Sequence, residues 1–239
     1  MKLSAPIPRL KSQARSLSRS EGIALHEALD RIARREGFNA WGLLVNRVSN
    51  TQHSKTLMAQ LKPGDLVLIG APPYQGKTRL CLELTVAAMK AGRRGVFFSL
   101  EFSASDIADS FVAIGESMNT YQDRFEFDDS DDICAPYIVD RLAAAPAGTL
   151  VVIDYLQLLD QKRENPSLAE QVVALKLFAR ERGLIIVCIS QIHRRYDAAL
   201  RPVPGLADVR LPNPLDTMLF NKAYFLNNGE MWSGEANRE

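Results

Sequence analysis

Four short apolar runs, separated by segments with helical spacing, constrain the fold of this 239-residue chain more than any other feature. The runs span residues 65–71, 95–101, 149–159 and 184–190. Strands that are apolar throughout are typical of a parallel sheet that is buried on both faces. The pattern therefore predicts an α/β fold, with a mostly parallel sheet and helices on both of its faces.

The segments between these runs predict the helices that cover the sheet. Apolar residues recur at helical spacing in residues 78–92, 104–118, 137–145 and 167–183. Ser167 is the expected N-cap of the last helix, and Glu170 lies three residues further on, at the spacing of a capping box. The acidic stretch 123–133 is predicted to be a loop that contains one short strand.

Residues 1–50 differ from the rest of the chain in charge. They hold nine Lys and Arg against four Asp and Glu, a net charge of +5, whereas residues 51–239 hold twenty against twenty-four, a net charge of −4. Apolar stripes that end at Gly22 and Gly37 predict a small basic three-helix unit. This charge suits contact with nucleic acid, and it also suits a solvated helix face.

We expect the polar stretch 49–60 to be a linker and residues 61–239 to form the second domain. No apolar run is long enough to span a bilayer, and the basic N-terminus lacks the apolar core of a secretory signal. Cys81 and Cys188 lie inside apolar stretches, as expected for reduced thiols. The sequence therefore predicts a cytoplasmic protein without a membrane segment.

The first apolar run leads into APPYQGKT, residues 71–78, and then into a helix. A strand, a loop that ends in Gly-Lys-Thr and a helix are the context of a phosphate-binding loop. Ala71 stands where glycine is usual, at a position that requires only a small residue. Lys77 would reach the β- and γ-phosphates of ATP, and the Thr78 hydroxyl would ligate Mg²⁺. The predicted nucleotide-binding residues are Ala71, Pro72, Pro73, Tyr74, Gln75, Gly76, Lys77, Thr78 and Arg79.

Three polar residues at the ends of other apolar runs complete the predicted site. Asp154 is expected on a strand beside that of the phosphate loop, where it would hold Mg²⁺ through water; alternatively, it caps a helix or turn. Glu101 would activate the attacking water, or it suits a helix N-terminus. Gln191 is an uncharged amide that can sense the γ-phosphate. We predict Lys77, Glu101, Asp154 and Gln191 as catalytic residues, and Thr78 and Asp154 as metal ligands, at the edge where open α/β sheets bind ligands.

The chain resembles the DnaB-type replicative helicases, which have a RecA-like P-loop NTPase core, in LKPGDLVLIGAPPYQGKT, VFFSLEFSASD, VVIDYLQLL and VCISQIHR. The resemblance implies ATP hydrolysis coupled to single-stranded DNA in a homo-oligomeric ring, usually a hexamer, with ATP sites between subunits. It also implies that Lys77 and Thr78 are the Walker A residues and Asp154 the Walker B residue. Glu101 would be the water-activating glutamate, and Gln191 would link the γ-phosphate to the DNA-binding loops.

The chain departs from this family in two features. The N-terminal unit is much smaller than the helical domain that the family usually carries, so the chain resembles a short form. The family also has a Lys-x-Arg-like motif that reaches into the neighbouring subunit's ATP site. Here Lys222 is the only basic residue near that place, and Arg238 lies at the tip. Arg194, Arg195 and Arg201 could substitute for the motif, contact DNA phosphates or be solvated.

Two loops are predicted to contact single-stranded DNA, residues 160–167 and 193–214. Basic side chains in such loops can follow the phosphate backbone. Tyr196 is the only aromatic residue in either loop, so base stacking has little support. The predicted nucleic-acid-binding residues are Lys162, Arg163, Arg194, Arg195 and Arg201.

These features predict an ATP-binding and hydrolysing motor ATPase of the helicase type that acts on single-stranded DNA. The alternative is a slow or degenerate DnaB-like ATPase that serves as a regulator or loader through its N-terminal unit. The missing Lys-x-Arg motif favours this alternative. A third hypothesis is a DNA-binding adaptor in which the N-terminal unit is active and the α/β domain is a scaffold.

Overall fold

The computed structural model describes residues 3–193, 195–197, 201, 203–211, 213, 215–227 and 229–234. The chain divides into two compact units, Met1–Gln52 and His53–Glu239, and the boundary falls inside a helix. No helix in the described part of the chain combines the length and the apolar character needed to cross a bilayer.

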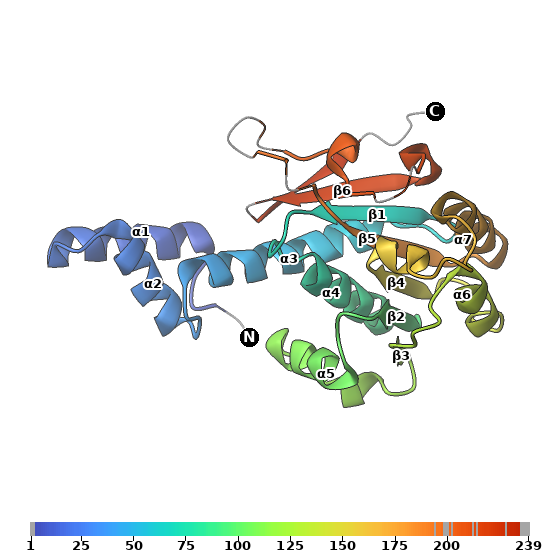
Figure 1. The fold of residues 1–239 in the computed structure, drawn as a ribbon. Helices are drawn as coiled ribbons and strands as arrows, with labels where there is room; N and C mark the ends of the chain where they lie inside the picture. Colours follow the sequence, from blue (N-terminus) through green and yellow to red (C-terminus); the bar gives the residue numbers. More distant parts are fainter. Residues whose placement is uncertain are drawn as a thin grey trace. The chain divides into compact units, whose positions relative to one another are not determined.

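The N-terminal unit consists of three helices, α1 (Ile7–Glu21), α2 (Leu25–Arg35) and the first part of α3 (Trp41–Gln60) (Figure 1). Gly22 ends α1 in the left-handed region, at φ 68°, which costs glycine little. The helices pack around a small apolar core formed by Leu10, Ala14, Ala28, Ile32, Ala33 and Leu44. The unit therefore buries an apolar cluster of its own.

The prediction of a linker at residues 49–60 is wrong, because α3 continues through them to Gln60. Leu57 and Leu61, four residues apart, are buried against the second unit's core. Gln60 also accepts a hydrogen bond from the Tyr224 hydroxyl at 3.0 Å. Only one narrow side of this part of α3 is apolar, so its helical pattern is too sparse to recognise in a polar stretch.

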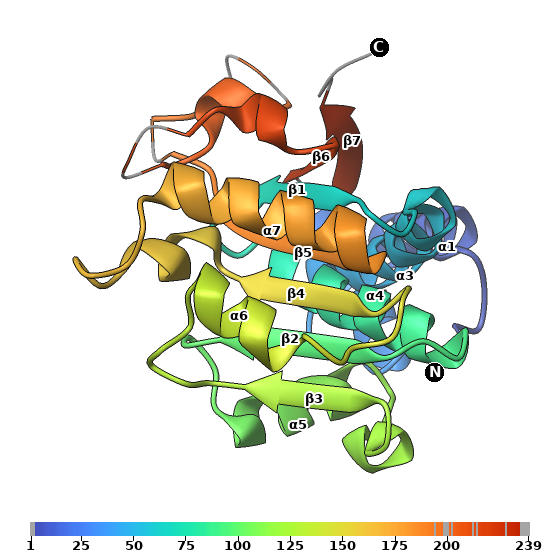
Figure 2. The same ribbon diagram turned by 90° about the vertical axis from the view of Figure 1, so that its right-hand side faces the viewer.

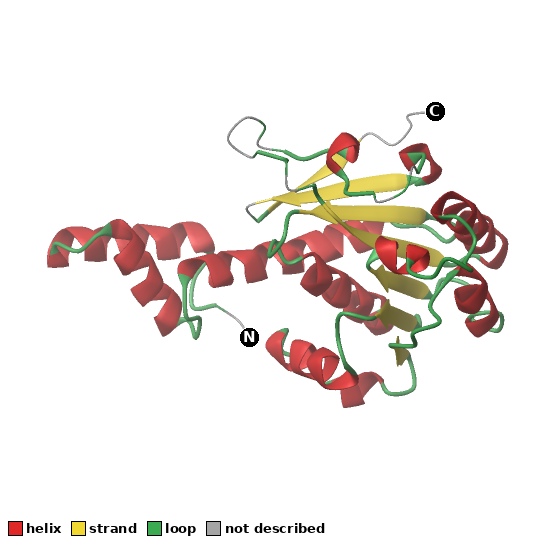
Figure 3. Ribbon diagram, in the orientation of Figure 1, coloured by secondary structure: helices red, strands yellow, loops and turns green. Residues whose placement is uncertain are grey.

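The second unit is built on one seven-stranded sheet (Figure 3). Its strands are β1 (Leu66–Ala71), β2 (Gly95–Ser99), β3 (Phe125–Asp128), β4 (Leu150–Asp154), β5 (Ile185–Gln191), β6 (Lys222–Asn227) and β7 (Glu230–Gly234). The strand order is β3-β2-β4-β5-β1-β6-β7, and every neighbouring pair is parallel except β6 and β7. The predicted α/β architecture is confirmed.

Helices cover both faces of this sheet, as Figure 2 shows. They are α4 (Lys77–Lys90), α5 (Ala104–Ala113), α6 (Ala135–Arg141) and α7 (Leu168–Arg182). One apolar core lies under α6 and α7, and the other lies under α4, α5 and the end of α3. The capping box predicted for the last helix is present, since Ser167 and Glu170 cap α7 reciprocally.

Two predicted elements are shorter than expected. The strand expected at 149–159 ends at Asp154, and a 3-10 helix, Leu156–Asp160, follows it. The helix expected at 104–118 ends at Ala113. In both cases the apolar pattern continues past the end of the element, because the residues that follow are also packed into the core.

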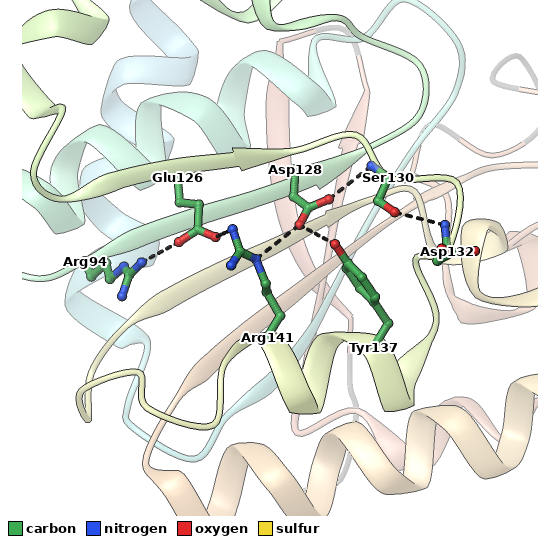
Figure 4. A network of polar contacts seen from close by, with 7 residues as sticks. All are labelled: Arg94, Glu126, Asp128, Ser130, Asp132, Tyr137 and Arg141. Atoms are coloured by element: carbon green, nitrogen blue, oxygen red, sulfur yellow. Dashed lines mark hydrogen bonds and ion pairs between the residues drawn. The ribbon is translucent and has the colours of Figure 1, made fainter.

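The strand β3 forms one edge of the sheet, and a polar network fixes it there (Figure 4). Glu126 and Asp128 are two residues apart and therefore share one face of the strand. Arg141 of α6 contacts both carboxylates, at 2.6 Å and 3.5 Å, and the Tyr137 hydroxyl donates to Asp128 at 2.9 Å. Arg94 also pairs with Glu126. The network holds the acidic stretch predicted at 123–133 against α6.

Candidate nucleotide site

The loop between β1 and α4 has the conformation that its sequence predicts. Gly76 takes the left-handed region at φ 78°, and α4 begins at the next residue. The first N–H groups of α4 therefore face the loop without helical partners, and a helix N-terminus of this kind suits phosphate. Tyr74 also has a positive φ, 63°, and its side chain is fully exposed.

A pocket of about 520 Å³ opens beside this loop. It brings together Lys77, Thr78, Glu101 and Gln191, which come from three separate elements and their ends. Other predicted nucleotide-binding residues in its lining are Pro73, Tyr74, Gly76 and Arg79. Ala71 is buried at the end of β1, and Pro72 and Gln75 are half-buried in the loop.

Sequence analysis missed the apolar half of this pocket. Its residues come from α4, α5 and the segment between β2 and α5: Leu82, Phe102, Ile107, Ala113 and Ile114. They recur at helical spacing, a pattern that predicts core packing rather than a binding site. The residues predicted to bind phosphate therefore share the pocket with an apolar surface that can accept a flat ring.

Asp154 ends β4 with its side chain completely buried. Neither carboxylate oxygen has a hydrogen-bond partner among the described residues. Burial raises the pKa of Asp154 to about 6, and the charge of Glu101 adds to this shift. The Thr78 hydroxyl and Lys77 act in the opposite direction on the pKa. The carboxylate therefore lies next to the phosphate loop, where Thr78 and Lys77 compensate its charge only in part.

The donors at this point fit a magnesium ion that carries ATP. Mg²⁺ is usually held by one or two protein oxygens, with phosphates and water completing its shell. Asp154 and Thr78 supply two such oxygens, and both carboxylate oxygens of Asp154 are free to act directly or through water. In the described part of the chain, no group of three or more His, Cys, Asp or Glu forms a metal cluster.

The strand of Asp154 is not the neighbour of the phosphate-loop strand, which corrects the prediction. β5 lies between them, so that β1 pairs with β5 and β5 pairs with β4. Gln191 is consequently in register with Ala71, directly beside the start of the loop. The order of strands in a parallel sheet is set by crossovers, which the sequence pattern does not show.

Glu101 lies next to this arrangement but not on a strand. β2 ends at Ser99, whose hydroxyl accepts the backbone N–H of Glu101 at 3.1 Å. β2 is adjacent to β4, with Ser99 in register with Asp154. The Glu101 carboxylate is exposed and lines the pocket. A solvated carboxylate at this place can hold a water molecule in front of the phosphate loop.

The residues predicted to contact nucleic acid have different surroundings. Lys162 pairs with Asp132 at 2.6 Å, whereas the side chains of Arg163 and Arg195 are exposed. Arg201 pairs with the buried Asp208. Arg194 lies outside the described residues. Two of the predicted cations are thus partly neutralised inside the chain.

The loop that follows β5 is anchored, in the sense that backbone contacts hold its two ends together. Ile192 bridges Val209, and the N–H of Arg210 donates to the Gln191 carbonyl at 2.8 Å. Tyr196 is half-buried, and its hydroxyl donates to the Arg201 carbonyl at 2.6 Å. The loop therefore starts and ends at the residue that we predict to sense the γ-phosphate, and its only aromatic ring is partly packed.

Gln157 connects segments beside the candidate site, and the sequence pattern does not reveal this role. It lies in the 3-10 helix after β4, and its side-chain amide donates to the Ser190 hydroxyl at 3.2 Å and to the Arg210 carbonyl. Its Oε1 atom is buried without a hydrogen-bond partner among the described residues. Gln157 therefore joins the segment after Asp154 to both ends of the anchored loop.

The side chain of Lys222 forms an ion pair within its own chain. It begins β6, where its ammonium group pairs with Asp65 at the start of β1. The pair is largely shielded, with 28% of the lysine side chain and 13% of the aspartate side chain exposed. Arg238 lies outside the described residues.

The fold is RecA-like. Residues 127–214 match the family model of the DnaB-like helicase C terminal domain. The resemblance to DnaB-type helicases seen in the sequence is thereby confirmed. The chain is similar to the "Replicative DNA helicase DnaB" of Leifsonia xyli, with 28% identity over 181 residues, which is 63% of this chain and 40% of that protein.

It is also 28% identical, over 195 residues, to the "Probable plasmid replicative DNA helicase" of Chlamydia muridarum, across 67% of this chain and 43% of that protein. The chain thus spans less than half the length of these relatives.

Solved structures give the same fold. A DnaB-like replicative helicase, studied with primase, superposes with a TM-score of 0.56 at 22% identity, over 69% of this chain and 47% of its own. An ATPase domain that was solved on its own also superposes with a TM-score of 0.56, at 21% identity and over 70% of each chain.

Proposed function

We propose that the second unit is an ATP-binding and ATP-hydrolysing motor domain of the helicase type that acts on single-stranded DNA. The observation that carries the proposal is the Asp154 carboxylate, which is fully buried without a hydrogen-bond partner among the described residues. Burying a charge is costly unless a partner compensates it, and a bound ligand can be that partner. Its place beside Thr78 and Lys77 suits a magnesium–phosphate group.

The pocket residues have distinct roles in this proposal. Mg²⁺, held by Thr78 and Asp154, would supply Lewis-acid polarisation of the phosphate oxygens. Lys77 and the first N–H groups of α4 would bind the β- and γ-phosphates. The exposed Glu101 carboxylate would orient the attacking water and take its proton. The amide of Gln191 would contact the γ-phosphate without opposing its charge.

Action on single-stranded DNA in a homo-oligomer, by family resemblance a hexamer, is the finer part of the proposal. It is supported by relatives named replicative DNA helicases and by the anchored loop that begins at Gln191. The exposed Arg163 and Arg195 would track the DNA backbone, with Lys162, Arg194 and Arg201 nearby in sequence.

The ATPase rate with and without single-stranded DNA tests this function. We expect Mg²⁺-dependent hydrolysis that the DNA stimulates, and we expect Lys77→Ala to abolish ATP binding. Lys55→Ala is the matched control, because it removes an exposed lysine of α3 with no ion pair among the described residues. Equal ATP affinity of the Lys77→Ala variant and the wild type would overturn the proposal.

A second function is favoured by one observation, the engagement of Lys222 with Asp65. With Lys222 committed to its own chain, no described cation stands where the family's Lys-x-Arg motif is expected. A cation supplied in trans accelerates related phosphoryl transfers by about 10³–10⁵-fold. The chain would then be a slow ATPase that acts as a regulator or loader through its N-terminal unit. Tight ATP binding with negligible stimulation by single-stranded DNA would distinguish this function.

A further inference from the structure

We propose that the N-terminal unit carries a groove that binds the phosphate backbone of double-stranded DNA without reading its sequence. The groove lies between α1 and α2 and has a volume of about 670 Å³. Its polar lining consists of Arg9, Ser12, Gln13, Ser16, Ser20 and Arg35. It belongs entirely to the first unit and shares no residue with the nucleotide pocket.

The carboxylates of this unit are already used inside it. All four accept hydrogen bonds from the unit's own groups, which are the Arg31 side chain, the backbone N–H and hydroxyl of Ser4, and the backbone N–H of Trp41. The acceptors are Glu21 at 2.6 Å and Glu27 at 2.8 Å, both from Arg31, Glu36 from Ser4, and Asp30 at 2.9 Å from Trp41. These carboxylates therefore have limited capacity to neutralise other cations.

Six cations of the unit are exposed and form no ion pair within its described residues: Arg9, Lys11, Arg15, Arg19, Arg34 and Arg35. Lys11, Arg15 and Arg19 are four residues apart, so they form one row along α1. These three residues do not line the groove, whose own arginines are Arg9 on α1 and Arg35 on α2. The groove thus has one arginine on each helix that forms no ion pair among the described residues.

The chemistry of the lining selects phosphate oxygens. The hydroxyls of Ser12 and Ser16 and the amide of Gln13 can donate hydrogen bonds, and arginine adds charge, the groups that contact DNA phosphates in general. Among the described residues, no aromatic side chain lines the groove, so single-stranded bases find no stacking platform on them. Its apolar lining residues are Leu17 and the buried Ile32, which offer little surface for insertion into a membrane.

The test is duplex binding by the full-length chain, measured without nucleotide as fluorescence anisotropy of a labelled duplex over a salt series. The variant Arg9→Gln/Arg35→Gln removes both groove arginines, and Ser16→Glu places a negative charge between them. The control Lys55→Gln/Arg180→Gln removes the same charge from exposed positions of the second unit. Thermal melting followed by circular dichroism verifies that each variant is folded.

We expect the arginine variant to lose about tenfold in duplex affinity and to reduce the slope of log affinity against log salt by about 2, since each phosphate contact contributes about 0.9. Ser16→Glu should weaken binding similarly, and the control should bind like the wild type. Equal losses in the control, or an unchanged slope in the arginine variant, would overturn the proposal. So would groove-dependent binding to phosphatidylserine vesicles without duplex binding. ATP hydrolysis should be unchanged in all these variants, which separates this site from the nucleotide pocket.

Discussion

At the scale of single residues, Asp154 is the most informative position. Its carboxylate is buried at the end of an apolar strand and has no hydrogen-bond partner among the described residues. The surrounding core raises its pKa from the ordinary value of 3.8 to about 6. Burial therefore disfavours the charged form of this group despite the nearby Lys77, and a further cation bound at this place would favour it.

The pH dependence of stability follows from this shift. Because the folded pKa is raised, folding binds a proton at Asp154, so its stabilising effect is complete below about pH 4 and is lost as pH rises to about 6. Asp154→Asn should therefore stabilise the nucleotide-free protein at pH 7.5 by up to about 3 kcal/mol, with no gain near pH 4. Urea unfolding at both pH values measures this difference.

The same variant should lose stabilisation by Mg²⁺ and ATP. Saturating ligand should raise the melting temperature of the wild type and leave Asp154→Asn almost unchanged, because the charged oxygen that compensates the cation is gone. Glu181→Gln, which replaces an exposed carboxylate near the end of α7, is a control for loss of one negative charge. An Asn variant that is less stable than the wild type at pH 7.5 would contradict this interpretation of the Asp154 site.

At the scale of elements, the ends of β4 and β5 are joined by the Gln157 amide. These two strands carry Asp154 and Gln191, and each is followed by a loop with predicted DNA contacts. A side chain that bonds to both sides can transmit a shift at one strand end to the loop after the other. Gln157 is not among the described residues that line the nucleotide pocket, so its role would be positioning.

Replacement of Gln157 by Ala should affect the stimulation of ATP hydrolysis by single-stranded DNA but not basal ATP hydrolysis. Basal ATP hydrolysis should remain near the wild-type rate, whereas stimulation by single-stranded DNA should fall about tenfold, equivalent to about 1.4 kcal/mol of coupling. Gln161→Ala, at an exposed position just after the same 3-10 helix, should leave stimulation intact. If basal and stimulated rates fell by the same factor, the role of Gln157 would be structural.

The helix α3 is an element whose second half the sequence did not reveal. Leu57→Ala should destabilise the second unit by about 2–5 kcal/mol, because a fully buried leucine is truncated there. Lys55→Ala, two residues earlier and exposed, should cost less than about 0.5 kcal/mol. Chemical unfolding of both variants measures the difference. Equal stability of the two variants would contradict the packing of Leu57 and would favour the linker that the polar composition predicted.

At the scale of the whole molecule, the sequence predicts most of the strands but not how they are ordered. Lys77, Glu101 and Gln191 were recognised separately, by one local pattern each, and the structure gathers them in one pocket. The position of β5 between β1 and β4 depends on crossovers through the core, which leave no local signal. The apolar pocket wall and the Gln157 contacts have the same origin, since both join residues that are distant along the chain.

An ion pair between residues far apart in the sequence also determines the role of Lys222. Sequence position alone makes it a candidate to reach a neighbouring subunit's ATP site, but in the fold it pairs with Asp65, 157 residues away. Breaking a shielded ion pair by removing one partner leaves the other charge uncompensated. The lysine therefore has a structural role that competes with any role in trans.

Mixing two defective variants distinguishes these roles. If Lys222 acted in trans, Lys222→Ala chains mixed with Lys77→Ala chains would regain activity, because a hybrid interface would contain one intact lysine of each kind. We expect no such rescue in a steady-state ATPase assay over a range of mixing ratios. We expect instead that Lys222→Ala lowers the free energy of unfolding by about 1–3 kcal/mol, and that much of this loss disappears when Asp65→Asn is already present. Recovery of activity in the mixture would show that the pair with Asp65 opens on assembly, and it would return Lys222 to the catalytic site.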